Sequence, residues 1–183
     1  VSNDGSTLLV AGTALEVSSI DGTGVATPVR AVSATGSRLF DVAVSHDERT
    51  VVAAGINNKA EVFSTDGGLS NLASIQSRAG PMGASDVTVH PTLDVFYMVG
   101  STEAAVVIYT RQSNGTLVES ERTRLQAAGR DVVVSRDGQF LWVVSPSANV
   151  VSTLALDSAG LPVGVPVTST VEGVGPTALL EVQ

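Results

Sequence analysis

Residues 131–145 read Asp-Val-Val-Val-Ser-Arg-Asp-Gly-Gln-Phe-Leu-Trp-Val-Val-Ser, and this stretch decides the fold. Successive residues of a β-strand point to opposite faces, so Val132 and Val134 share one face of an extended segment. Asp137-Gly138 has the residues of a tight turn, and a second apolar run follows it. The stretch therefore predicts a strand, a turn and a second strand.

The same pattern occurs four times at a spacing of about 45 residues. The four copies begin at Val1, Val44, Val89 and Val134. After each copy come a third strand, such as residues 106–109 or 150–154, a glycine-containing turn and a fourth apolar segment. Four short strands in each repeat are typical of a β-propeller blade. The sequence thus predicts an all-β propeller with four four-stranded antiparallel blades, near residues 1–40, 41–85, 86–130 and 131–180.

The pattern Val-x-Val-Ser-x-Asp-Gly-x-x-Leu-x-Val, with a Gly-x-Leu turn after it, resembles the YVTN-type repeats of the lactonase-like β-propeller superfamily. Residues 131–145 are the closest match, and the likeness extends over all four repeats. The resemblance implies a propeller fold, usually of seven blades, and a lactonase-like activity. None of the positions in this chain matches a catalytic motif of the family, because the shared residues are those of the repeat.

The two ends of the sequence fit one motif when they are joined. Glu181 of the C-terminal Glu181-Val182-Gln183 then falls at the position of Asp41, Asp86 and Asp131 in the other repeats. Residues 181–183 would therefore complete the first blade. Three arrangements satisfy this pattern. The chain closes as a four-bladed ring, two chains close as an eight-bladed homodimer, or further blades come from elsewhere.

Composition excludes several classes of function. The net charge is −8 and Lys59 is the only lysine, so the basic surface that nucleic-acid binding needs is missing. A run of 18 or more apolar residues is absent, so membrane insertion is not expected. With zero cysteines, disulfides and thiolate chemistry are excluded. The acidic composition, rich in serine, threonine and glycine, favours an exported or surface location in a prokaryote: extracellular, periplasmic or cell-surface. A cytoplasmic location is the alternative.

Acidic residues recur at the start of each innermost strand, at Asp41, Asp86, Asp131 and Glu181. In a propeller these positions lie near one mouth of the central channel. Four carboxylates there could bind Ca²⁺ or another hard cation, since such ions prefer oxygen ligands. The alternative is structural, with each carboxylate accepting backbone N–H bonds. Recurrence in every blade favours the structural interpretation.

Arg38, Arg78 and Arg130 precede or approach the same strands, so they are candidates for binding an anionic ligand by bidentate hydrogen bonds. The alternative is that they pair with nearby acidic residues. His46 and His90 occupy equivalent turns between first and second strands. They could bind a metal or act as acid and base, but the position predicts exposed turn histidines instead.

These observations predict a propeller module for binding or assembly without catalytic residues, which takes a protein or small molecule at the channel mouth. No cofactor is expected beyond Ca²⁺. The alternative function is a lactonase-like hydrolase or isomerase with its site at the channel mouth.

Overall fold

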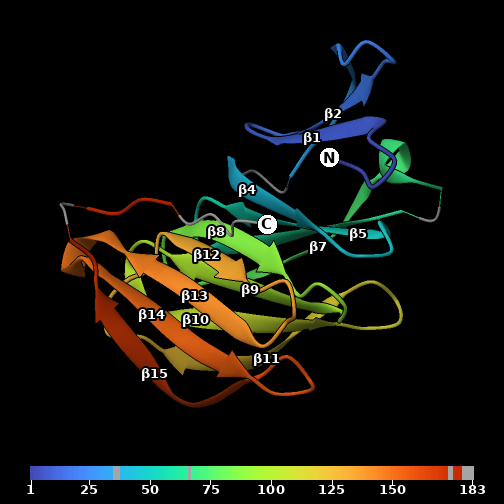
Figure 1. Cartoon of the computed structure of the whole chain (residues 1–183). Coiled ribbons are helices and arrows are strands. Elements are labelled where there is room, and N and C mark those ends of the chain that lie inside the picture. Colours follow the sequence, from blue (N-terminus) through green and yellow to red (C-terminus); the bar gives the residue numbers. More distant parts are fainter. Residues whose placement is uncertain (35–37, 66, 173–174, 179–183) are drawn as a thin grey trace.

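The computed structural model describes residues 1–34, 38–65, 67–172 and 175–178, and they form four antiparallel sheets in a row (Figure 1). We number the sheets as blades 1 to 4. Blade 1 contains β1 (Thr7–Ala11), β2 (Leu15–Ile20) and β3 (Ala26–Val32); blade 2 contains β4 (Leu39–Val44), β5 (Thr50–Gly55), β6 (Lys59–Ser64) and β7 (Ala73–Ala79). Blade 3 contains β8 (Ala84–Val89), β9 (Val95–Gly100), β10 (Glu103–Arg111) and β11 (Leu117–Arg124); blade 4 contains β12 (Asp131–Val134), β13 (Phe140–Ser145), β14 (Val150–Leu156) and β15 (Pro162–Thr170). The predicted all-β blades are confirmed.

Helix is limited, in the described ranges, to two short 3₁₀ turns, Leu69–Asn71 and Pro146–Ala148. Neither turn has the length or apolar character needed to cross a membrane.

Blade 1 has three strands where the other blades have four. Its first strand, β1, follows the same Ser-x-Asp turn that precedes β5, so it corresponds to a second strand. The position that β4, β8 and β12 fill in their own blades is therefore not filled in blade 1 by a described residue. Residues 181–183, which were predicted to fill it, lie outside the described part of the chain.

The repeated Ser-x-Asp motif builds the turn between first and second strands. In blade 2, Ser45 Oγ donates to Asp47 Oδ1 at 2.7 Å and accepts the Thr50 N–H at 3.0 Å. Asp47 also accepts the Arg49 N–H at 3.1 Å. The same bonds form in blade 1 from Ser2 and Asp4 and in blade 4 from Ser135 and Asp137. The motif therefore satisfies backbone donors that a tight turn leaves unpaired.

His90 takes the place of this serine in blade 3, and the prediction of an exposed side chain was wrong for it. The residue is only 5% exposed. Its Nδ1 accepts the N–H groups of Thr92 and Leu93, both at 3.2 Å, while Nε2 lies 3.2 Å from the Gly138 carbonyl of blade 4. The imidazole replaces the serine hydroxyl as turn acceptor and also reaches the next blade. His46 is exposed, as predicted.

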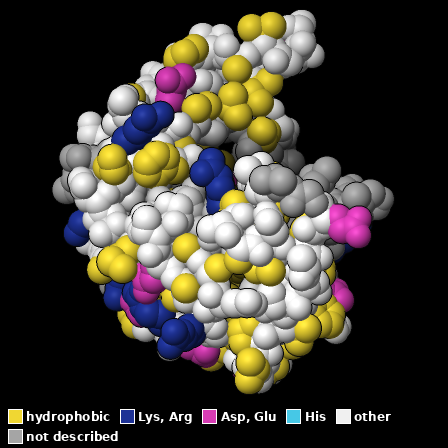
Figure 2. All heavy atoms as spheres, turned by 90° about the vertical axis from the view of Figure 1, so that its left-hand side faces the viewer, with side chains coloured by type: hydrophobic (Ala, Val, Ile, Leu, Met, Phe, Trp, Pro, Cys, Tyr) yellow, Lys and Arg dark blue, Asp and Glu magenta, His cyan; other side chains and the backbone are white. Residues whose placement is uncertain are grey.

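Hydrophobic clusters join each blade to the next. Leu15 and Phe63 belong to the cluster between blades 1 and 2, Phe96 to that between blades 2 and 3, and Tyr97 and Leu141 to that between blades 3 and 4. No such cluster of described residues joins blade 4 to blade 1. Figure 2 accordingly shows an arc around a hollow rather than a closed four-bladed ring.

Candidate functional site

The aspartates of the inner strands connect one blade to the next. Asp41 Oδ2 in β4 accepts the Val87 N–H of β8 at 3.1 Å. Asp86 Oδ2 in β8 accepts the Val132 N–H of β12 at 2.7 Å in the same way. A carboxylate from each blade thus satisfies a backbone donor at the channel edge of the following blade, which is the structural role foreseen as the alternative to metal binding.

Asp86 lies between two other carboxyl groups of the channel wall. Burial raises the pKa of Asp86 to about 9, and the charge of Asp41 and hydrogen bonds with Asp41 and Asp131 act in the same direction. Adjacent carboxylates disfavour a second negative charge, so Asp86 is protonated at neutral pH. The channel wall therefore carries a neutral carboxylic acid among its acidic residues.

The predicted Ca²⁺ site involves these same residues. Within the described ranges, His, Asp and Glu side chains do not form a group of three arranged to hold a metal ion. Glu181, the fourth predicted ligand, lies outside those ranges. Binding of a cation by the complete set of four carboxylates stays a prediction.

A β-bulge precedes the aspartate in two of the inner strands. Leu39 pairs with Gly55 and Asp41 with Ala54, so Phe40 is an extra residue without a partner in the ladder. Ser85 is the extra residue of blade 3 in the same way. Bulges redirect side chains at the rim of a sheet, and here they place Phe40 and Ser85 at the channel mouth.

A cavity of about 660 Å³ opens at this mouth. It spans the ends of blades 2, 3 and 4 at which the inner strands begin. Its lining consists of Phe40, Ile56, Asn57, Asn58, Gly83, Ala84, Ser85, Ser101, Arg130 and Thr177. We call it the mouth cavity. Its polar groups come mainly from loops held by their own hydrogen bonds, so the cavity is formed in advance of any ligand.

The wall of the mouth cavity contributed by blade 2 is a two-residue turn. Asn57 and Asn58 both have positive φ, 64° and 60°, as a hairpin with a type I′ turn requires. Asn58 Oδ1 accepts the Gly83 N–H at 2.7 Å, which ties this turn to the loop before β8. On the opposite wall, Ser85 Oγ donates to the Arg130 carbonyl at 3.1 Å.

Arg130 is the basic residue of the mouth cavity. Among the described residues, no hydrogen bond or ion pair involves its guanidinium, and the side chain is exposed. The pairing with neighbouring acids foreseen as the alternative is therefore not observed within that part of the chain. An unpaired guanidinium in a polar cavity can accept an oxyanion or carboxylate.

The other two predicted arginines do not line the mouth cavity. Arg38 lies over the Phe40 ring, 5.8 Å from its centroid, next to the cavity rim. Arg78 lies in the outer strand β7, where its guanidinium donates to the Leu117 carbonyl and lies 5.7 Å from the Tyr109 ring centroid. The prediction that Arg78 belongs to the mouth was wrong, because an outer-strand residue reaches the neighbouring blade instead.

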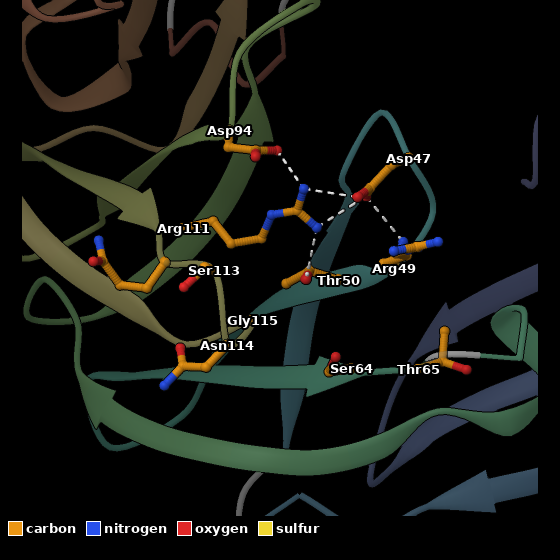
Figure 3. Close-up of a pocket in the computed structure, with 11 residues that line it drawn as sticks. Asp47, Arg49, Thr50, Ser64, Thr65, Asp94, Arg111, Ser113, Asn114 and Gly115 are labelled. Atoms are coloured by element: carbon orange, nitrogen blue, oxygen red, sulfur yellow. Dashed lines mark hydrogen bonds and ion pairs between the residues drawn. The ribbon is translucent and has the colours of Figure 1, made fainter.

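A second polar cleft, of about 390 Å³, lies at the ends of blades 2 and 3 that carry the turns between first and second strands (Figure 3). Arg111 extends across it to two aspartates. Its two terminal nitrogens bond Asp47 at 2.8 and 2.9 Å, and Nη2 also bonds Asp94 at 2.7 Å. Thr50 Oγ1 accepts a further hydrogen bond at 3.2 Å.

The charges in this cleft neutralise one another. Burial raises the pKa of Asp47, but hydrogen bonds from Arg111 and Ser45 outweigh this effect and hold the pKa well below its usual range. Burial likewise opposes the rise in the pKa of Arg111 that its bonds to Asp47 and Asp94 cause. The guanidinium is thus committed to joining blades 2 and 3, and the cleft offers less charge to a ligand than the mouth cavity does.

His46 and His90 both line a smaller cavity of about 200 Å³. Both ring nitrogens of His90 have partners within the protein, so it lacks a free atom for acid–base work.

Several residues of the mouth cavity escaped sequence analysis. Phe40 and Ser85 each stand directly before a recurring aspartate, and Asn57-Asn58 is a turn dipeptide that could have indicated a hairpin tip at the mouth. Their convergence depends on how the blades pack.

Neither a family profile nor a curated protein sequence matches the chain. Among solved structures, the periplasmic gluconolactonase of Pseudomonas aeruginosa superposes with a TM-score of 0.80 at 19% identity, over 96% of this chain and 57% of that one. A candidate 6-phosphogluconolactonase of Bacteroides fragilis gives 0.74 at 20% identity, over 97% and 55%.

The same fold occurs in the hydrazine synthase structure of Kuenenia stuttgartiensis, with a TM-score of 0.74 at 17% identity, over 97% of this chain and 63% of that one. The chain spans a little more than half the length of the lactonase-type structures. The predicted resemblance to lactonase-like propellers is confirmed for the fold, and at these identities for the fold alone.

Proposed function

We propose that the mouth cavity is part of the active site of a hydrolase that opens the cyclic ester of a sugar acid. The lactonase-type fold supports this, and the guanidinium of Arg130, which has no partner among the described residues, carries it in a polar cavity of about 660 Å³. The volume is within the range typical of small-molecule sites.

The chemistry of lactone opening suits this residue. Water attacks the ester carbonyl, the carbonyl oxygen gains negative charge, and the ring oxygen leaves with a proton. Arg130 would stabilise the charge on the carbonyl oxygen in the transition state and then bind the carboxylate of the product. Asn57, Ser85 and Ser101 supply amide and hydroxyl groups suited to the hydroxyls of a sugar acid.

The described lining of the mouth cavity contains neither a carboxylate nor a histidine. We therefore place the base that activates water outside this lining. Asp131 immediately follows Arg130 and is one candidate. The lactonase-type structures are nearly twice as long as the part that matches this chain, so residues of further blades are the other.

The test is hydrolysis of glucono-1,5-lactone, followed by titration of the acid released at constant pH, with the spontaneous rate subtracted. The Arg130→Ala variant should lose about 100-fold or more in kcat/KM, the usual cost of removing a group that stabilises an oxyanion. Arg49→Ala is the matched control, because Arg49 is an exposed arginine in the other cleft. It should hydrolyse the lactone at the unchanged rate. If the wild-type chain hydrolyses the lactone no faster than the spontaneous reaction, the proposal is overturned.

A second candidate function is binding without catalysis. It is favoured because Asp41 and Asp86 each accept a hydrogen bond from a backbone N–H of the next blade, so these carboxylates join blades instead of serving catalysis. In that case calorimetry should detect gluconate binding without lactone turnover, and Arg130→Ala should weaken the binding about 10-fold, equivalent to about 1.4 kcal/mol. If gluconate does not bind and the lactone is not hydrolysed, both functions are excluded.

A further inference from the structure

A second cavity adjoins the mouth cavity where blade 3 meets blade 4. It has a volume of about 350 Å³, and its lining shares Ser101, Arg130 and Thr177 with the lining of the mouth cavity. The two cavities therefore meet at these three residues. We call this second space the side cavity. The rest of its lining consists of Ala128, Gly129, Pro146, Ser147 and Gly175.

The lining that belongs to the side cavity alone is poor in polar side chains. Of its five described members, two are glycines, one is an alanine and one is a proline, so Ser147 supplies the only side-chain hydroxyl among them. The mouth cavity differs, because Asn57, Asn58 and Ser85 contribute amide and hydroxyl groups to its lining. The combined space is therefore polar on one side of Arg130 and largely apolar on the other.

Backbone groups in the walls of the side cavity are already bonded within the protein. The Arg130 N–H donates to the Val144 carbonyl at 2.8 Å, and the Arg130 carbonyl accepts from Ser85 Oγ at 3.1 Å. The Gly175 N–H donates to Asn149 Oδ1 at 2.9 Å. These groups are thus not available to a ligand, and a polar group buried against them without a partner would cost free energy. An apolar group is the occupant that the side cavity favours.

The packing of blades 3 and 4 fixes one wall of the side cavity. Gly129 is buried, and a Cβ atom at this position would lie 2.7 Å from Val143 Cγ1 and 2.9 Å from Val99 Cβ. Only glycine fits there, so the loop before β12 lies directly on the interface of the two blades. Leu125, earlier in the same loop, is 3% exposed in the hydrophobic cluster of that interface. The wall is therefore in place before a ligand binds.

We infer that the substrate of the mouth cavity carries an apolar substituent, which the side cavity binds. This inference rests on the proposed function, in which Arg130 binds the ester carbonyl and then the carboxylate of the product. With that group at Arg130, the ring lies in the polar mouth cavity and a substituent on it extends past Arg130 into the side cavity. The substrate class is then a lactone with a short alkyl or aryl group, and the side-cavity volume of about 350 Å³ accommodates such a group.

The experiment compares two lactones that have the same ring. δ-Decalactone carries a pentyl chain that δ-valerolactone lacks, and hydrolysis of both is followed by titration of the acid released at constant pH. The value of kcat/KM should be about 10-fold higher for δ-decalactone, the factor expected from burial of about two methylene groups. Calorimetry with the ring-opened products, 5-hydroxydecanoate and 5-hydroxypentanoate, should show the same preference in Kd.

The Ser147→Trp variant tests where the pentyl chain binds. Ser147 is an exposed residue of the side-cavity lining, so an indole at this position occupies the cavity without disturbing the core. The preference for the pentyl-bearing compounds should disappear in this variant. Ser113→Trp is the matched control, because Ser113 is an exposed loop serine in the cleft that contains Arg111. It should keep the preference.

The outcomes separate this inference from the proposed function. If neither lactone is hydrolysed but 5-hydroxydecanoate binds more tightly than 5-hydroxypentanoate, the hydrolase is excluded and the apolar subsite is supported. Hydrolysis of glucono-1,5-lactone without a preference for the pentyl chain supports the hydrolase and overturns the inference. The inference is also overturned if neither product binds, or if Ser147→Trp leaves the preference unchanged.

Discussion

Arg111 ends β10 of blade 3, Arg130 directly precedes β12 of blade 4, and the two arginines are used in different ways. Arg111 is 12% exposed and bonds two aspartates and a threonine across the boundary of blades 2 and 3. Arg130 lines the mouth cavity, and among described residues its guanidinium has no such partner. The comparison distinguishes an arginine that is neutralised within the protein and joins two blades from one that, in the proposed site, is left for a ligand.

Two aspartates, Asp47 and Asp86, also differ, because their pKa values are shifted in opposite directions. Asp47 belongs to the Ser-x-Asp turn and has a lowered pKa, although burial opposes the shift, because Arg111 and Ser45 donate to it. Asp86 belongs to the channel wall and has a pKa raised to about 9, because it is buried beside Asp41. One carboxylate is held ionised and the other is held neutral, so their effects on stability have opposite dependence on pH.

The largest effect should come from breaking the arginine contact of the cleft. Arg111→Ala leaves Asp47 and Asp94 without a counter-charge and removes the bond between blades. The free energy of unfolding in urea at pH 7 should fall by about 2–4 kcal/mol, somewhat less than for a fully buried pair. Arg49→Ala, in the same cleft, should change it by less than about 0.5 kcal/mol. Equal losses in both variants would show that Arg111 has no special role.

Asp86→Asn tests the neutral carboxyl group of the channel. In the wild type, the unfolded chain loses this proton near pH 4 while the folded chain keeps it to about pH 9. The contribution of Asp86 to the free energy of unfolding is therefore fully present below about pH 4 and declines as the pH rises toward 9. Asparagine can still accept the Val132 N–H and does not titrate. Asp86→Asn should gain about 1–3 kcal/mol over the wild type at pH 8 and little at pH 4. A gain that is the same at every pH would refute the assigned protonation state.

Asp47→Asn should show the opposite pH dependence. The folded-state pKa is lowered, so the stabilisation is present above the unfolded pKa near 4 and is lost as the pH falls below it. At pH 7 the variant should lose about 1–2 kcal/mol, the scale of hydrogen bonds to a charged group that is partly exposed. In thermal unfolding the difference from the wild type should shrink steadily as the pH falls from 4 to 2, because the stabilisation is lost completely only below the folded-state pKa. A difference that is as large at pH 2 as at pH 7 would point to packing rather than charge.

Arg130→Ala should change stability least of all. An exposed side chain without described partners contributes within about 0.5 kcal/mol, so the melting temperature should hardly move. This result would separate any loss of lactone hydrolysis from unfolding. A loss above about 1 kcal/mol would mean that Arg130 has a structural partner, and the contrast with Arg111 would fail.

Sequence analysis predicted the fold well because the repeat is local. The alternation of valines around Asp131 and the Ser-x-Asp turn each act within about ten residues, a range over which side-chain period and turn chemistry decide the structure. The aspartates of the inner strands were also found, together with their structural alternative. His90 was misjudged, since nothing local shows that its ring reaches Gly138, 48 residues away.

The candidate site was predicted only in part. Arg130 was identified, but Arg78 was grouped with it although it lies on an outer strand. Phe40 and Ser85 were missed because a bulge depends on the pairing register of two strands, and a single strand does not reveal it. Arg111 was missed because its two aspartates are 64 and 17 residues distant.

The sequence by itself determined that this protein is a series of four β-blades with serine–aspartate turns and acidic inner strands. These properties follow from the order of neighbouring residues. Only the tertiary structure decided that Arg111 pairs with two aspartates, that Arg130 has no such partner among the described residues, and that burial raises the pKa of Asp86. Each of these depends on which blades meet, and burial and charge pairing exist only once distant segments are packed together.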